Sequence, residues 1–297
     1  MATTKTRTKG TKNVKPATAG AARTPKARRA ARCETLDVEV RNSVAMVALA
    51  RPDVHNAFNA TLIDELNRTL RALDADDTVR AVILLGQGRS FCAGADLGWM
   101  KAMAAYGHAE NVADAAALAA MLATLARLSK PTIARVHGPA FGGGVGLVAC
   151  CDIAIAAYDA TFSLSEAKLG LIPATISPYV IEAIGARHAR RYFLSAERFT
   201  AAEAFRIGLV HEIVPGGELD AHINEMLGSL LVAGPGAQAA AKALIRAVAH
   251  RPIDGEVIAD TAERIAAARA SAEGREGVAA FLDKRAPAWV PAALKPE

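Results

Sequence analysis

Two glycine-containing segments hold residues that could stabilise a negatively charged oxygen. They are residues 91–97, FCAGADL, and residues 137–146, HGPAFGGGVG. Each follows an apolar run, 79–85 and 131–136, that is typical of a short buried strand. Because glycine has no side chain, a ligand can come close to the main chain of such a loop. Two backbone N–H groups on two loops can then converge on one oxygen and form an oxyanion hole.

The order of short motifs along the chain resembles the crotonase superfamily, that is, the enoyl-CoA hydratase/isomerase family. The matching segments are the two glycine loops, RPDVHNAF at 51–58, CDIA at 151–154, SE at 165–166 and EGREG at 273–277. A lone glycine triplet is more often a flexible turn, but these matches occur in order from about residue 36 onward. The resemblance implies an α/β fold, a crotonase-type spiral of strand–strand–helix units with a C-terminal helical oligomerisation region.

The resemblance also implies acyl-CoA chemistry. Family members hold the thioester oxygen between two backbone N–H groups while an enolate forms, and by motif position these donors are Ala95 and Gly143. Each such donor is typically worth about 3–4 kcal/mol of transition-state stabilisation. Gly143 is predicted to open a helix, whose dipole adds to the effect. The alternative, that both residues only form tight turns, is disfavoured because both loops occur in the family's order.

Family hydratases typically use two glutamates, and this chain retains one of them. Glu166 matches the glutamate ahead of a Gly-x-x-Pro segment, whereas the other position falls on Gly146. A single carboxylate can take a proton from water and then return it to the α-carbon. Gly146 predicts a void for that water or for a bulkier β-carbon substituent. The missing negative charge favours an acyl group that carries its own carboxylate, because like charges repel.

The motif text is most similar to bacterial hydratases of branched glutaconyl-CoA esters, through residues 95–101, 142–152 and 176–180. We therefore expect reversible hydration of a 2-enoyl-CoA, either 3-methylglutaconyl-CoA of leucine degradation or γ-carboxygeranoyl (isohexenylglutaconyl)-CoA of terpene degradation. Positional isomerisation of a 3-enoyl-CoA needs only one carboxylate and is the main alternative. A thioester hydrolase or decarboxylase of the same fold, and RNA binding through a basic tail, stay open as further alternatives.

The resemblance further implies which residues hold coenzyme A. They are Val54, His55, Ala57, Ala93, Asp96 and Leu97, with Gly142 and Gly146 toward the acyl end and Phe281 and Lys284 from the C-terminal region, often of a neighbouring subunit. Lys284 is equally typical of a solvated helix charge. The expected partners are an acyl-CoA substrate and further copies of the chain, as a trimer or a pair of trimers. Coenzyme A belongs to the substrate, and no other cofactor or metal is expected, since the 7 histidines form no metal-spaced pair.

Charge is distributed unevenly along the chain. The formal net charge is +5, yet residues 1–32 hold ten Lys and Arg and no acidic residue, so the remainder is net acidic. This tail has almost no large apolar residue and is predicted to be disordered. A solvated extension is the favoured interpretation, ahead of a nucleic-acid contact and a transit peptide.

These patterns divide the chain into a basic tail, 1–32, a spiral core, 33–220, and a helical region, 221–297. Within the core, the alternation at 36–49 predicts a hairpin, Asn59 predicts a helix cap, and 97–128 reads as one long helical stretch. Its apolar part, 115–126, is too short to span a bilayer and is predicted to be buried. The four cysteines have no metal-site spacing, and no hydrophobic signal opens the chain. We expect a cytoplasmic enzyme with no membrane partner.

Overall fold

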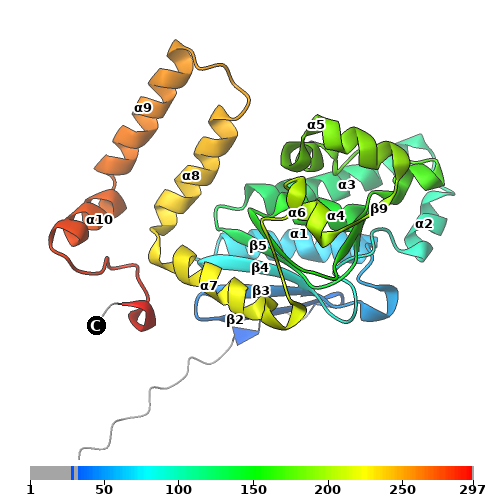
Figure 1. The fold of residues 1–297 in the computed structure, drawn as a ribbon, viewed down its shortest axis with the longest axis horizontal. Helices are drawn as coiled ribbons and strands as arrows, with labels where there is room; N and C mark the ends of the chain where they lie inside the picture. The colour runs from blue at the N-terminus through cyan, green and yellow to red at the C-terminus, as the bar shows by residue number, and fades with distance from the viewer. Residues whose placement is uncertain (1–27, 30–32, 296–297) are drawn as a thin grey trace, which may run out of the picture.

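The computed structural model describes residues 28–29 and 33–295, and a seven-stranded sheet lies at its centre (Figure 1). The strand order is β1 (Arg28–Arg29), β2 (Leu36–Arg41), β3 (Val44–Leu49), β4 (Ala81–Gly86), β5 (Thr132–Val136), β7 (Ile153–Ala157) and β10 (Glu212–Val214). The first two pairs are antiparallel, which confirms the predicted hairpin, and the others are parallel. Arg28 and Arg29 pair with β2, unlike the predicted disorder; the rest of the basic tail lies outside the described residues.

A second, three-stranded sheet carries the loops of interest. Its order is β6 (Ala140–Phe141), β8 (Thr161–Ser163) and β9 (Arg198–Thr200). Isolated parallel bridges join Cys92 to Ala140 and Phe58 to Ala95. The segments around Phe58, residues 92–95 and Ala140, which are far apart in the sequence, therefore lie side by side.

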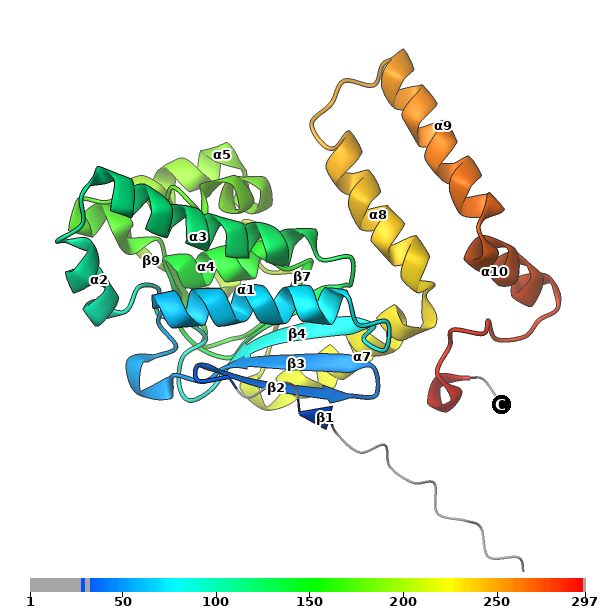
Figure 2. The ribbon, with the colours of Figure 1, turned by 180° about the vertical axis from the view of Figure 1, so that it is seen from behind.

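Helices cover both faces of the large sheet. The helices of the described residues are α1 (Ala60–Asp74), α2 (Leu97–Met103), α3 (His108–Arg127), α4 (Gly143–Cys150), α5 (Ser177–Ser195), α6 (Ala201–Arg206), α7 (Leu219–Val232), α8 (Pro235–Val248), α9 (Gly255–Ala270) and α10 (Ala272–Leu282), with 3-10 turns at Pro52–Val54, Ser165–Leu169, Gly216–Glu218 and Ala292–Leu294. On β4, Val82 and Leu84 join the core beneath α1, α3, α4 and α5, whereas Ala81 and Ile83 join the one beneath α7 (Figure 2). The continuous apolar run at this strand follows from burial of both faces.

Two helix predictions need correction. The stretch 97–128 is two helices, α2 and α3, because residues 104–107 interrupt it. The other error concerns burial: only Met121, Leu122 and Leu125 of α3 are buried. By length and composition α3 could cross a membrane, and its most apolar window is only 17% buried. Alanine-rich surface carries little periodic signal, so the sequence did not separate its buried face from its exposed one.

The boundary of the helical region also differs from the prediction. We placed it after residue 220, but α7 packs its leucines and Ile223 against the sheet and belongs to the core. The helices α8, α9 and α10 stand away from the rest (Figures 1 and 2). Arg80 ties their base to the core by donating to the carbonyl oxygens of Ala233, at 2.7 Å, and Trp289, at 3.2 Å.

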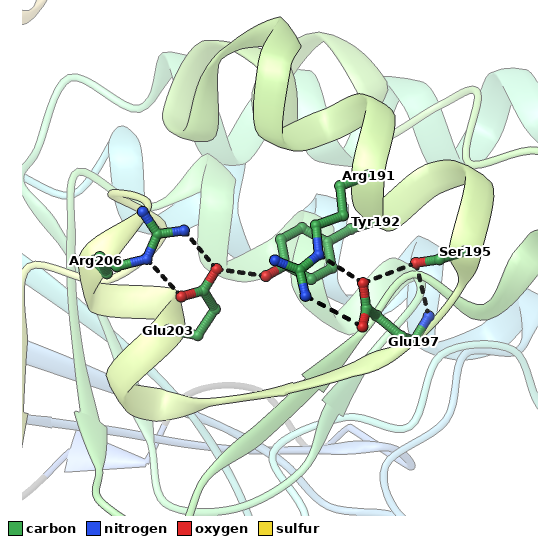
Figure 3. A network of polar contacts seen from close by, with 6 residues as sticks. All are labelled: Arg191, Tyr192, Ser195, Glu197, Glu203 and Arg206. Atoms are coloured by element: carbon green, nitrogen blue, oxygen red, sulfur yellow. Dashed lines mark hydrogen bonds and ion pairs between the residues drawn. The ribbon is translucent and has the colours of Figure 1, made fainter.

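A polar network fixes α5 to α6 (Figure 3). The buried Tyr192 donates its hydroxyl proton to Glu203, at 2.5 Å, and Arg206 holds the same carboxylate through Nε and Nη2. Hydrogen bonds from Arg206 and Tyr192 lower the pKa of Glu203 to about 2, while burial and Glu203 raise the pKa of Tyr192 to about 12. The network therefore fixes α5, the helix that follows the 3-10 turn Ser165–Leu169 with Glu166.

Candidate active site

The main chain around Ala95 is oriented by its pairing with Phe58. The Phe58 N–H donates to the Gly94 carbonyl at 2.6 Å, and the Phe58 carbonyl accepts from the Asp96 N–H at 2.9 Å. In a parallel bridge of this kind the residue between the two bonded ones directs its own N–H and C=O to the opposite side. The Ala95 N–H therefore points away from Phe58, and in the described part of the chain it has no acceptor. Ala95 is also exposed, so a ligand oxygen can reach it.

Gly143 supplies the second predicted donor at the first position of α4. A helix leaves its first N–H groups without intrahelical partners, and among the described residues none accepts from Gly143. The Phe141 N–H donates to the Cys92 carbonyl at 2.9 Å, which holds the second loop against the first. The two predicted donors thus lie on loops that are hydrogen-bonded to each other.

Glu166 lies beside these loops in the 3-10 turn Ser165–Leu169. Its Oε1 atom is 3.1 Å from the position that a Cβ on Gly142 would take, so only glycine fits there comfortably. Its Oε2 atom is buried and has no hydrogen-bond partner among the described residues. Burial raises the pKa of the Glu166 carboxyl, and a hydrogen bond from its own N–H opposes this only in part. A buried, unpaired carboxylate with a raised pKa is suited to act as a general base.

The predicted void at Gly146 is wrong. A Cβ at this position would lie 2.2 Å from Cγ2 of Ile176 and 2.9 Å from its Cβ. Ile176 is 2% exposed and precedes α5. The space of a side chain at position 146 is therefore already filled by an isoleucine methyl group. Gly146 lies one helical turn after Gly142, and its N–H donates to the Gly142 carbonyl at 3.3 Å.

The predicted coenzyme A loop is packed against the first glycine segment. The N–H of Ala93 donates to the carbonyl of His55 at 3.0 Å, and the N–H of Ala57 donates to that of Val54 at 3.1 Å. These N–H groups are committed within the chain. Any main-chain contact with coenzyme A at these residues would therefore use carbonyl oxygens, each of which has a second lone pair.

The outermost predicted contacts are not all brought together. Leu97 is 83% exposed beside Ala95, and Phe281 is 82% exposed on α10. Helix α10 and the neighbouring Lys284 lie at the opposite end of the molecule from α2 (Figures 1 and 2). Phe281 and Lys284 therefore do not reach the site of their own chain. A role for them depends on a second copy, as the family resemblance implied.

The carboxylate of Asp96, a predicted coenzyme A contact, is bonded within the chain. Its Oδ1 atom caps α2 by accepting from Gly98 and Trp99, and its Oδ2 atom accepts from Arg51 Nη2 at 2.9 Å. Arg51 also donates to the carbonyl of Ala57. Burial alone would raise the pKa of Asp96, but these hydrogen bonds hold it below its usual value. The Arg51–Asp96 pair thus cross-links the coenzyme A loop to the residue after Ala95, a contact that sequence spacing does not reveal.

Asp96→Asn is expected to lower kcat/KM for a 2-enoyl-CoA about tenfold. Asparagine still caps α2, but the ion pair is lost and the Ala95 amide is held less firmly; the free energy of unfolding should fall by about 1–3 kcal/mol. Steady-state kinetics and urea unfolding measure both. Asp64→Asn is the control, because its pair with Arg68 is exposed and should change stability by less than about 0.5 kcal/mol. Equal effects of the two substitutions would contradict the cross-linking role.

Comparisons with known proteins identify the family to which this fold and these motifs are similar. A model of the enoyl-CoA hydratase/isomerase family matches residues 39–291. The structure is similar to an enoyl-CoA hydratase from Shewanella pealeana, with a TM-score of 0.84 and 43% identity over 86% of this chain and 96% of that one. It is also similar to Pseudomonas aeruginosa AtuE, with a TM-score of 0.82 and 39% identity over 87% and 100% of the two chains. A crotonyl-CoA hydratase from Syntrophomonas wolfei is 32% identical over 85% of this chain and 96% of its own length.

Proposed function

The chain belongs to the enoyl-CoA hydratase/isomerase family, and from this premise we propose that it hydrates a branched glutaconyl-CoA such as 3-methylglutaconyl-CoA. The observation that carries the proposal is the Glu166 carboxylate, whose buried Oε2 atom has no hydrogen-bond partner in the described part of the chain. It lies next to Gly142, one residue before the Gly143 donor. A proton acceptor and a site for a developing oxyanion are thus adjacent.

The reaction follows from these positions. The N–H groups of Ala95 and Gly143 hold the thioester oxygen, and Glu166 takes a proton from a water molecule as its oxygen adds to the β-carbon. The C=C electrons move toward the thioester oxygen, where the two donors stabilise the enolate. Glu166 then returns the proton to the α-carbon, so that one water has been added and the carboxylate is restored.

The acyl specificity follows from the side chain that is absent at position 146. A glutamate there would place a second negative charge beside the acyl chain, whereas Ile176 presents a methyl group in its place. A substrate carboxylate would meet one fewer like charge. Two of the named relatives are an enoyl-CoA hydratase and a crotonyl-CoA hydratase, which makes crotonyl-CoA the natural competing substrate.

Comparing 3-methylglutaconyl-CoA with crotonyl-CoA tests the substrate proposal. We expect kcat/KM for the acidic substrate to exceed that for crotonyl-CoA at least tenfold, which corresponds to about 1.4 kcal/mol. Loss of the absorbance of the conjugated double bond measures both rates. Activity on crotonyl-CoA alone would refute the charge argument while leaving the hydratase in place. Activity on neither substrate would refute the hydratase proposal.

Positional isomerisation of a 3-enoyl-CoA is the second candidate, and one observation favours it. Ile176 fills the place of a second acid/base group, and moving a double bond needs only one carboxylate to carry a proton between two carbons. Product analysis after incubation with a 3-enoyl-CoA separates the two reactions: a 2-enoyl product without added water identifies the isomerase.

We also propose that the protein works as a cytoplasmic trimer or pair of trimers. The helices α8, α9 and α10 project from the core (Figure 1), and Phe281 is 82% exposed on them. Exposed large apolar side chains on a projecting element are typical of a surface that another copy covers. In this arrangement Phe281 and Lys284 contact coenzyme A bound to a neighbouring subunit.

A further inference from the structure

Phe58 belongs to neither glycine loop, yet it contacts both. It follows the 51–57 loop, and its N–H and C=O hold Gly94 and Asp96, the residues on either side of Ala95. These two hydrogen bonds, at 2.6 and 2.9 Å, fix the peptide units that flank the first oxyanion donor. The backbone of Phe58 therefore sets the direction of the Ala95 N–H.

The ring of Phe58 contacts the second donor. A Cβ on Gly143 would lie 2.5 Å from the ring atom Cε2 and 2.9 Å from Cδ2. The ring therefore fills the space that a side chain at position 143 would take. Phe58 is 1% exposed and belongs to the same hydrophobic core cluster as Leu62 and Leu122. The ring is thus a rigid spacer on which the N-terminus of α4 rests.

We propose that Phe58 is the positioning residue that sets the separation and direction of the two oxyanion N–H donors. Its backbone aligns the Ala95 N–H and its ring supports the main chain of Gly143. The positions of both donors therefore depend on one buried residue. Phe58 does not touch the substrate; it acts through Ala95 and Gly143. The inference rests on the proposed function for its rate measurements, but one of its tests requires no turnover.

The chemical consequence is a selective loss in the transition state. Charge on the thioester oxygen is larger in the enolate than in the bound substrate, so misplaced donors weaken transition-state binding more than substrate binding. A side chain that only fills the core would instead lower stability and leave kcat unchanged. The split between kcat and KM therefore separates positioning from packing.

Phe58→Leu is the first test, with Phe199→Leu as the matched control. Phe199 is also buried, at 6% exposure, and lies on β9, which β8 separates from the second glycine loop. We expect Phe58→Leu to lower kcat at least tenfold with KM changed less than threefold, and Phe199→Leu to change kcat less than twofold at a similar loss of Tm. Phe58→Met, whose unbranched and flexible side chain can reach farther into the space of the ring, is the second variant should the leucine variant fail to fold.

A double-mutant cycle tests the contact itself. In the native background, Gly143→Ala drives its methyl group into Cε2 of Phe58. Leucine has neither Cε2 nor Cζ, so the clash is relieved in the Phe58→Leu background. The fold-reduction of kcat caused by Gly143→Ala should therefore be at least tenfold smaller in that background than in the native one. Equal factors in the two backgrounds would show that ring and donor are uncoupled and would overturn the proposal.

Ligand binding tests the proposal without turnover. Acetoacetyl-CoA can ionise to an enolate and place charge on the thioester oxygen, whereas butyryl-CoA cannot. At pH 8, Phe58→Leu should weaken acetoacetyl-CoA binding at least fivefold more than butyryl-CoA binding, measured by calorimetry. Equal weakening of both ligands would overturn the positioning role. If the native protein hydrates no 2-enoyl-CoA but Phe58→Leu still weakens acetoacetyl-CoA binding selectively, the proposed function is refuted and the positioning role of Phe58 stands.

Discussion

Glu166→Gln is expected to lower the rate of hydration by about 10²–10⁴-fold, the usual contribution of a positioned general acid–base group. Glutamine keeps the shape of the side chain but cannot accept the proton of water. The oxyanion donors stay in place, so KM should change little. Stopped assays on the preferred 2-enoyl-CoA measure the residual rate. Glu182→Gln, at an exposed position on α5, is the control and should retain full activity.

The pH dependence of the native rate follows from the same burial. Desolvation raises the pKa of Glu166 above its usual 4.5, and the base must be ionised to work. The acidic limb of kcat/KM should therefore have its midpoint above pH 4.5 and disappear in Glu166→Gln. A limb at or below pH 4.5, or a rate loss of less than threefold in the variant, would contradict the assignment of Glu166 as the base.

Stability should change in the opposite direction from activity. A carboxyl whose pKa is raised on folding stabilises the protein below its unfolded pKa, and this stabilisation is lost as the pH rises through the folded pKa. At pH 7.5 the ionised Glu166 is thus a cost to folding. The Tm of Glu166→Gln at this pH should equal or exceed that of the native protein, which excludes unfolding as the reason for inactivity.

Gly146→Glu is expected to destabilise the protein instead of supplying the missing second glutamate. The new Cβ would lie 2.2 Å from Cγ2 of Ile176, and overpacking of this kind costs about 1–3 kcal/mol. Burying the carboxyl without a partner adds about 1–3 kcal/mol more. A fall in Tm of about 10 °C follows for a domain of this size, and calorimetry measures it. Gly228→Glu on α7, where an added Cβ meets nothing within 4 Å, should leave Tm nearly unchanged.

Ile176→Ala tests whether this isoleucine is the cause. Alone it should cost about 2–5 kcal/mol, as removal of a buried isoleucine side chain does. Combined with Gly146→Glu it makes room for the new side chain. The double variant should therefore lose less free energy of unfolding than the two single variants lose in sum. A second carboxylate near Glu166 should also shift the preference from 3-methylglutaconyl-CoA toward crotonyl-CoA. Strict additivity of the two stability changes would refute the contact.

Local signals in the sequence were enough to predict the candidate site. The alternation at 36–49 became a hairpin because each strand has a period of two, and Asn59 caps α1 by accepting from the Leu62 N–H at 2.8 Å. The two glycine loops can be recognised as motifs because they need residues without a side chain at fixed positions. The turn with Glu166 can be recognised because it needs an acidic residue at one fixed position. These constraints act within a few residues, so the order of residues records them.

Only the tertiary structure decided what surrounds those motifs. Ile176 fills the space at Gly146 from thirty positions away, Arg51 holds Asp96, and Phe58 joins Ala95 to Gly143. In the sequence, none of Ile176, Arg51 and Phe58 differs from an ordinary core or ion-pair residue. Side-chain packing between distant segments leaves no periodic pattern by which these contacts could be predicted. The sequence by itself determined the family, and it predicted the oxyanion loops and the single base. Three-dimensional packing decided that the second acid position is closed and that Phe281 and Lys284 lie away from their own site, since those outcomes depend on which segments meet across the core.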